Sequence, residues 1–151
     1  MAYIPKDARW YLADVVLEHV VAGDPRNVVH INLHLIEADS PERAYEKAIS
    51  LGQACEQVYS NTDGQEVAVR FRGLRDLNVI HEALEDGAEL AFKESIGVPE
   101  DRLSTWLRAK EKLSVFSKRQ AKQDVPNYMP GSVMKSLEEA GFSRKEIEGE
   151  G

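Results

Sequence analysis

Two groups of side chains have the residue types and spacing that could support binding chemistry. The first contains three arginines, Arg70, Arg72 and Arg75. On a β-strand, Arg70 and Arg72 would share one face and lie ~7 Å apart. Two guanidinium groups at that spacing can bind a carboxylate or a phosphate together. Left unpaired, this arrangement would suit an anionic ligand or an acidic partner.

The same arginines also have a purely structural interpretation. The chain carries a net charge of −7, so carboxylates are abundant. Asp14, Glu18 and Glu89 are expected on adjacent strands, where they could neutralise the arginines through cross-strand ion pairs. We favour this interpretation, because surface ion pairs are common in an acidic protein. Arginines left unpaired would instead favour an anionic ligand.

The second group is the segment His-Ile-Asn-Leu-His, from His30 to His34. Its alternating polarity predicts a strand, on which the two histidines are ~13 Å apart. That separation is too large for one zinc ion, whose nitrogen ligands lie at about 2.0–2.1 Å. His19 and His81 could approach them only through strand pairing that the sequence does not specify. We therefore predict no metal here, and a polar sheet face that carries His30, Asn32 and His34.

The composition predicts a soluble globular protein of one domain, with or without an appendage. The 151 residues are 42% hydrophobic and 30% charged, and the acidic net charge disfavours nucleic acid and anionic membranes. The basic segment 108–122 is the exception. Its single aromatic residue, Phe116, fits the apolar stripe of a helix better than a base-stacking surface. We favour a solvated helix end there, and contact with nucleic acid through this segment is the less favoured alternative.

The sequence has no feature that is typical of a secreted or membrane protein. The one cysteine, Cys55, cannot form an internal disulfide, and its place on an apolar helix stripe predicts a buried small hydrophobe. No apolar stretch approaches the roughly 20 residues that span a bilayer, and the first residues do not resemble a signal peptide. We expect a cytoplasmic location. Common nucleotide, metal and nucleophile motifs are absent, so we expect no cofactor, and the evidence for an enzyme is weak.

Periodicity predicts a long antiparallel hairpin near the start of the chain. Residues 9–21 are rich in β-branched and aromatic side chains, and residues 28–38 alternate between apolar and polar. A helix over about 40–58, capped by Asp39 or Ser40, is expected to cover the odd-numbered face of this hairpin. In the second strand that face consists of Val29, Ile31, Leu33 and Leu35.

The even-numbered face of the first strand is also apolar. A strand that is apolar on both sides is usually covered on both sides. Self-association could supply this cover, and so could docking of Trp106, Leu113 and Phe116 from the tail. The predicted association surface consists of Trp10, Leu12, Val16, Val20, Trp106 and Phe116.

Further strands are predicted over 66–72, ended or kinked by Gly73, and over 89–94. Residues 76–85 fit either an extended segment or a short helix, and we favour the extended one. Together the elements predict an α+β fold, in which an antiparallel sheet of four to five strands carries one helix on a face.

The rest of the chain is predicted to be a helical extension. We divide the sequence into an α+β domain, 1–96, and a C-terminal extension, 97–151. In the extension a linker with two prolines, 124–131, precedes a short helix over 133–140. The first helical pattern begins at Pro99 and includes Leu103, Trp106, Leu107, Leu113 and Phe116.

The most distinctive motifs are WYLADVV at 10–16, NVVHINLHLIEADSPERAYEKA at 27–48 and VRFRGLRDLNVIHEALEDGAEL at 69–90. Together they resemble a family of small bacterial proteins known only as a domain of unknown function. The resemblance covers about residues 9–95, and the FRGLRDL corner at 71–77 is its most specific part. It implies a shared fold and carries no established activity, cofactor or catalytic residue.

We expect a non-enzymatic module for binding or protein interaction, with a protein partner or a second copy as its ligand. Its sheet is expected to present one polar face that bears both the histidines and the arginines. The alternative is a small-ligand-binding protein, or an enzyme that uses this face for an anionic molecule. The residues of the face are His30, Asn32, His34, Arg70 and Arg72, with Arg75 beside them.

Overall fold

The computed structural model describes residues 7–117 and 124–131. These residues fall into two compact units, of which the first contains 7–92 and 126–131 and the second contains 93–117 and 124–125. The first unit holds the sheet and the main helix, and it contains every strand of the described chain.

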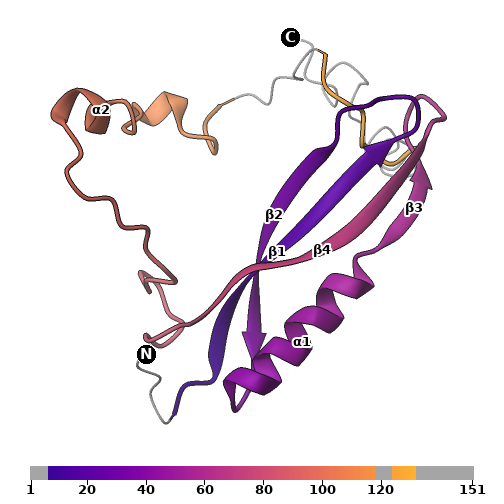
Figure 1. Cartoon of the computed structure of the whole chain (residues 1–151). Helices are drawn as coiled ribbons and strands as arrows, with labels where there is room; N and C mark the ends of the chain where they lie inside the picture. The colour runs from indigo at the N-terminus through magenta and orange to yellow at the C-terminus, as the bar shows by residue number, and fades with distance from the viewer. Residues whose placement is uncertain (1–6, 118–123, 132–151) are drawn as a thin grey trace. The chain divides into compact units, whose positions relative to one another are not determined.

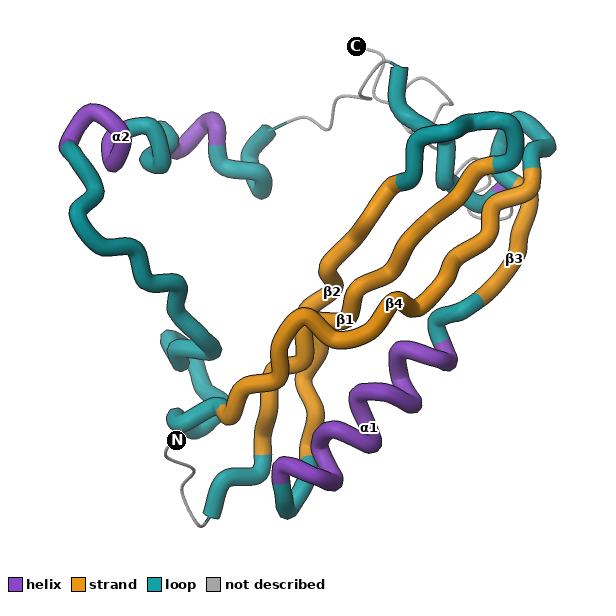
Figure 2. The backbone as a smooth tube through the Cα atoms, in the orientation of Figure 1, coloured by secondary structure: helices purple, strands orange, loops and turns teal. Residues whose placement is uncertain are grey.

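The first unit is a four-stranded antiparallel sheet with one helix on it (Figure 1). Its strands are β1 (Trp10–Val21), β2 (Val28–Glu37), β3 (Gln57–Ser60) and β4 (Glu66–Val79), in the spatial order β2-β1-β4-β3. The long strands β1, β2 and β4 form the body of the sheet, and helix α1 (Pro41–Ala54) runs along one side (Figure 2). The predicted α+β class is confirmed.

Helix α1 starts where the sequence predicts. Ser40 is the N-cap, and its hydroxyl accepts a hydrogen bond from the backbone N–H of Arg43. The helix ends at Ala54, so the predicted extension to residue 58 is wrong. The β-branched and aromatic pair Val58 and Tyr59 joins β3 instead, because this short strand can pair with β4.

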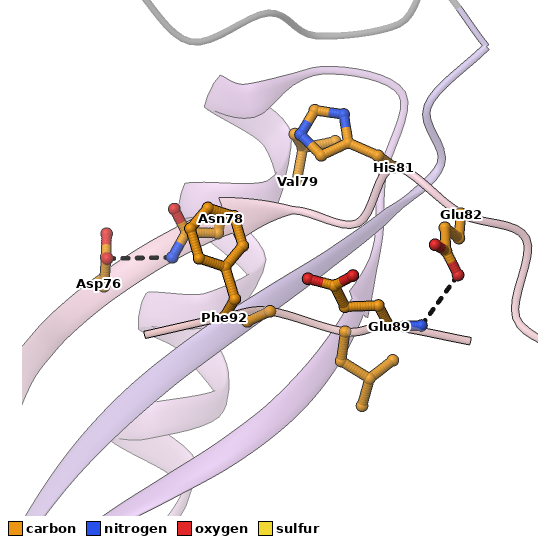
Figure 3. A pocket seen from close by; sticks show the side chains of 9 residues that line it. Asp76, Asn78, Val79, His81, Glu82, Glu89 and Phe92 are labelled. Atoms are coloured by element: carbon orange, nitrogen blue, oxygen red, sulfur yellow. Dashed lines mark hydrogen bonds between the residues drawn. The ribbon is translucent and has the colours of Figure 1, made fainter. Parts of the chain in front are cut away.

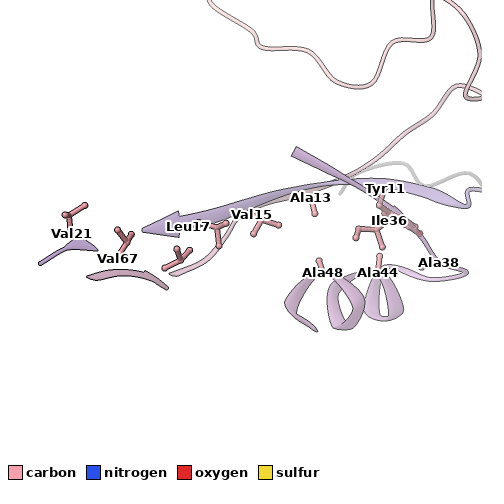
Figure 4. Packing of buried hydrophobic residues seen from close by; sticks show 11 residues of the cluster. Tyr11, Ala13, Val15, Leu17, Val21, Ile36, Ala38, Ala44, Ala48 and Val67 are labelled. Atoms are coloured by element: carbon pink, nitrogen blue, oxygen red, sulfur yellow. The ribbon is translucent and has the colours of Figure 1, made fainter. Parts of the chain in front are cut away.

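The hydrophobic core lies between α1 and the face of the sheet that we call the inner face (Figure 4). Small side chains on the helix let it approach the strands closely. At Gly52, a Cβ atom would lie 2.3 Å from the ring of Phe71 on β4. The odd-numbered residues of β1 form the centre of this core, as predicted. They are Tyr11, Ala13, Val15, Leu17 and Val21, all buried.

The two faces of strand β2 are reversed relative to the prediction. Cross-strand partners share a face, and Asn32 lies opposite Val15 on β1, while His30 lies opposite Leu17. The polar row of β2 is therefore on the inner face, and its apolar row is on the other. The reason is the position of α1, which packs mainly on β4 and β1, so that the inner side of β2 is a partly open margin.

Strand β4 is longer than predicted. It continues through Gly73, which has a φ of 131°, and reaches Val79. Two β-bulges, at Arg72 and Arg75, bend the strand without ending it. The extended alternative for 76–85 is correct as far as Val79.

No strand forms over 89–94, although β-like alternation predicted one. The short segment offers Leu90 and Phe92 as inward residues, yet both are exposed. In the described chain these residues do not pair with any strand of the sheet. Alternation alone, without pairing to another strand, is too weak to make a strand.

The second unit contains α2 (Glu100–Ser104) and one 3-10 turn, η1 (Lys110–Lys112). The predicted long helix from Pro99 is therefore wrong. Its apolar side chains have no sheet within their own unit to pack on, and Trp106 and Phe116 are both at least half exposed. No described helix is long and apolar enough to cross a membrane. The predicted helix at 133–140 lies outside the described residues, as does part of the basic segment 108–122.

Candidate functional site: the outer face of the sheet

The face of the sheet opposite α1, which we call the outer face, carries a row of exposed apolar side chains. The row lies on β2, at the edge of the sheet, and its side chains are 40–60% exposed. Helix α1 is the only described helix of this unit, and it lies on the inner face. We call this set the apolar row. It consists of Val29, Ile31, Leu33 and Leu35.

Strand β1 extends the apolar row towards the middle of the sheet. Val16 lies opposite Ile31 in the strand register, and Leu12 lies opposite Leu35. Val20 is 39% exposed, whereas Leu12 is buried between β2 and β4. The four β1 residues of the predicted association surface, Trp10 included, thus lie on one face beside the apolar row. The other two members of the predicted association surface, Trp106 and Phe116, belong to the second unit.

The ammonium group of Lys110 lies 5.3 Å from the centre of the Phe116 ring. This contact occupies the ring with a cation from its own unit. It gives Phe116 a local role that the sequence pattern did not suggest, and it leaves most of the ring exposed.

Two arginines on the outer face are paired with carboxylates of β1. Arg75 donates from Nε and Nη2 to Oδ2 of Asp14, at 3.0 and 2.8 Å. Arg72 Nη1 lies 3.6 Å from Oε1 of Glu18. The structural interpretation of the arginines thus holds for Arg72, and it extends to Arg75. Among the described residues no ion pair involves Arg70, which lies opposite Glu18 in the register.

The bulges of β4 explain how these arginines reach their partners. Asp14 is opposite Asp76 and Val15 is opposite Leu74, so Arg75 is the extra residue between them. A bulge turns the side chain of its extra residue out of the regular alternation. The Arg75 guanidinium, half exposed itself, therefore reaches a carboxylate whose side chain is only 10% exposed. The sequence gives no sign of these bulges beyond Gly73.

The predicted single polar face does not exist, because the histidines lie on the inner face. There the ring of His30 is 4.7 Å from that of His19 and 5.0 Å from that of Tyr128, measured between centroids. His19 is buried, and Nδ1 lies 3.3 Å from the carbonyl oxygen of Val28. Burial lowers the pKa of His19, and His30 lowers it further, against the opposing effect of the Val28 carbonyl.

The other two β2 members of the predicted polar face lie on the same side of the strand as His30. Asn32 and His34 are half buried on the inner face of β2. The Nε2 atom of His34 is buried without a hydrogen-bond partner among the described residues. The described residues also contain no group of three or more histidine, cysteine or acidic side chains that could hold a metal.

Residues 126–131 return to the first unit and hold the end of β3. The Tyr59 hydroxyl donates to the carbonyl of Tyr128. Asn61 Nδ2 donates to the carbonyl of Asn127 at 2.9 Å, and the Asn127 amide donates to Thr62 Oγ1 at 2.6 Å. Burial raises the pKa of Tyr59, with a smaller contribution from Tyr128. Proline content predicted a linker here, and nothing in the sequence indicated this docking.

A shallow cavity of about 460 Å³ opens beside the end of β4 (Figure 3). Two of its three acidic side chains are engaged locally. Glu82 accepts a hydrogen bond from the backbone N–H of Glu89 at 2.9 Å, and Asp76 accepts one from Asn78 Nδ2 at 3.0 Å. Three carboxylates around one small opening disfavour an anionic molecule.

Comparison with known proteins gives one match. A family model described as a domain of unknown function matches residues 10–92. No curated protein and no solved structure matches the chain. The matched region spans the four strands and α1, together with residues 80–92, which follow β4.

Proposed function

The chain belongs to the DUF4288 family of domains of unknown function, and we propose that it is a non-enzymatic protein-interaction module whose binding surface is the outer face of the sheet. One observation carries the proposal: four alternate side chains of β2 are apolar and 40–60% exposed in a continuous row. Isolated apolar residues are normal on protein surfaces, whereas contiguous apolar patches are typical of interaction sites. The single cysteine of the chain fits a reducing compartment, and we propose that the protein is cytoplasmic.

The shape of the surface favours a protein over a small molecule. From Val29 to Leu35 the row extends ~20 Å at about 3.3 Å per residue. Small-molecule sites are concave and enclose most of their ligand. An extended row on an open sheet instead suits the flat, apolar centre of a protein interface.

The ion pairs of the outer face count against the anionic-ligand alternative. Arg75 and Arg72 already neutralise Asp14 and Glu18. A phosphate or carboxylate would have to displace these partners, and the displaced Asp14 carboxylate would be left mostly buried. Of the three predicted arginines, only Arg70 lacks an ion pair among the described residues, and a single cation makes a weak anion site.

Site-specific photocrosslinking in cells tests the proposal. A photoreactive phenylalanine analogue at Leu33, which is 60% exposed, is expected to give discrete adducts with one or a few proteins. The matched control places the same analogue at Tyr45, a similarly exposed residue on α1. The expected adducts require Leu33 and disappear when Ile31→Lys is added.

Two results would count against the outer face as a binding surface. One is the absence of any discrete adduct at Leu33. The other is an identical set of adducts at Leu33 and Tyr45, because a non-specific collision partner would react at both positions.

A further inference from the structure

We propose that the open edge of β2 pairs antiparallel with β2 of a second copy of this chain, about a two-fold axis. This inference rests on the proposed function and names the partner. It predicts that two four-stranded sheets join into one continuous sheet, with the two apolar rows side by side on its outer face.

The first argument concerns backbone groups along the edge. The N–H of Ala38 donates to the carbonyl of Arg9 at 2.8 Å, and the N–H of Ile80 donates to that of Trp10 at 2.9 Å. In antiparallel sheets hydrogen bonds join directly opposite residues in alternate pairs. Odd-numbered residues of β1 therefore bond to β2, and even-numbered ones bond to β4.

The register between β2 and β1, which has no shift along its length, determines which residues of β2 bond to β1. The even-numbered residues of β2 bond to β1. The odd-numbered residues point their N–H and C=O groups away from β1, towards the open edge. These are the residues of the apolar row, so Val29, Ile31, Leu33 and Leu35 offer both free backbone groups and apolar side chains.

The second argument is that this edge lacks the features that keep sheet edges apart. Natural edge strands are usually short, bulged, or interrupted by lysine or proline. From Val28 to Ile36, β2 has no charged residue and no proline. The opposite edge, β3, is only four residues long, and an isolated bridge joins Asn61 just beyond it to Pro130. Among the described segments none pairs with the outer edge of β2.

The third argument is that β2 matches itself. Only odd-numbered residues have free backbone groups, so odd must pair with odd, which a two-fold axis at Asn32 or at Leu33 achieves. With the axis at Asn32, Ile31 lies opposite the partner's Leu33 and Val29 lies opposite the partner's Leu35. Apolar side chains then meet apolar ones across the junction, and cross-strand pairs of this kind stabilise a sheet.

Charge does not oppose this pairing, despite the net charge of −7 on each chain. Asp14 and Glu18, the carboxylates of the strand next to β2, are neutralised by Arg75 and Arg72. Glu37, the one charged residue of β2, is at the end of the strand and pairs with Arg9 at 3.1 Å. An edge junction is a small interface, below about 1,200 Å², so we expect reversible, concentration-dependent association.

Sedimentation of the full chain over a wide concentration range tests the inference. The mass is expected to rise from 16.9 kDa towards twice that value as concentration increases. Leu33→Pro removes an N–H that points to the open edge, where proline is tolerated. Ile31→Lys places a charge in the junction. Both variants are expected to stay monomeric and folded, whereas Tyr45→Lys on α1 should associate like wild type.

Disulfide trapping locates the junction. In a Cys55→Ser background, Asn32→Cys or Leu33→Cys is expected to form a covalent dimer under mild oxidation, faster than Tyr45→Cys does. Which of the first two reacts faster identifies the position of the axis.

A chain that remains monomeric at every concentration overturns the inference. So does a dimer that persists in Leu33→Pro and Ile31→Lys, or that is trapped no faster at β2 than at Tyr45. None of these results overturns the proposed function, because adducts between Leu33 and a different protein would still support an interaction module.

Discussion

The two faces of this sheet have the same alternating strands and very different surroundings. On the inner face, β1 and β4 pack on α1, and Val15 and Val67 are completely buried. On the outer face, the apolar row of β2 is about half exposed. Hydrophobicity therefore does not decide which side of a strand is covered. The side on which the helix packs decides it, and α1 packs on β4 and β1 more than on β2.

The difference is sharpest at β2, where the polar residues lie on the helix side. His30 and Asn32 can occupy inner positions because α1 leaves the margin of the sheet partly open there. The apolar residues of the same strand are then forced onto the outer face. This arrangement leaves the apolar row either as a tolerated apolar surface or as the binding surface of a partner, and we infer the partner.

The largest expected effect is the difference in the free energy of unfolding between a substitution on the inner face and one on the outer face. Val15→Asp would bury an unpaired carboxylate in the core and is expected to cost more than about 4 kcal/mol of the free energy of unfolding, enough to unfold the chain. Leu33→Thr, on the outer face, is expected to change that free energy by less than about 0.5 kcal/mol in the monomer, because threonine suits a half-exposed strand position and adds no charge opposite Asp14. Urea denaturation followed by circular dichroism measures both.

Similar losses for the two variants would mean that the outer face is packed in the folded monomer. A folded Val15→Asp would be equally damaging to the assignment of the inner face as the core side.

The next effect distinguishes the two ion-paired arginines of the outer face. Arg75→Ala leaves the mostly buried Asp14 carboxylate without its partner and is expected to cost about 2 kcal/mol, less than a fully buried pair because Arg75 is half exposed. Arg72→Ala removes a longer, more exposed contact and is expected to cost no more than about 0.5 kcal/mol. Chemical denaturation at constant pH tests both.

Equal costs for Arg75→Ala and Arg72→Ala would show that the depth of the carboxylate does not control these pairs. The double variant Asp14→Asn/Arg75→Ala offers a check, because removing the charge of Asp14 should recover part of the lost stability.

A smaller effect concerns pH on the inner face. The pKa of His19 is lowered in the folded protein, so the unfolded chain binds a proton first as pH falls. The stability that comes from keeping His19 neutral is complete above the unfolded pKa of 6.5, and it is lost as pH falls from 6.5 through the lower folded pKa. The groups around His19 are His30, Tyr128 and the Val28 carbonyl.

Thermal unfolding of wild type between pH 7.5 and 5 should therefore show a fall in Tm below about pH 6.5. His19→Gln should make this fall shallower, and His30→Gln should do so to a smaller extent. An unchanged profile in His19→Gln would show that other groups cause the fall.

Much of the fold follows from the sequence, because the relevant interactions are local. The start of α1 needs only Ser40 and Pro41, and the β1–β2 hairpin needs only alternation and a turn at Gly23. The predicted end of α1 is wrong because Val58 continues an apolar helical stripe as well as it fits a strand. Whether Val58 joins the helix or a strand depends on pairing with β4, which lies later in the chain.

The candidate site was only partly predictable for the same reason. The apolar even face of β1 is visible in the sequence, and the structure places Trp10, Leu12, Val16 and Val20 together. The apolar row of β2 is visible in the sequence as well, but the predicted position of the helix puts it on the wrong side. Alternation defines two faces and cannot say which one the helix will cover. The Arg75–Asp14 pair depends on a bulge, and the cluster of His19 with Tyr128 depends on contacts between distant parts of the chain.

The smallest effect leaves stability unchanged and appears only in amide hydrogen exchange along β2. At concentrations low enough for a monomer, the amides of Asn32 and His34 should be protected, because even-numbered residues bond to β1. The amides of Ile31 and Leu33 should exchange much faster, because they point to the open edge. At high concentration the fast amides should become protected if β2 pairs with a second copy. Uniform protection along β2 in the dilute monomer would instead mean that the chain covers this edge itself.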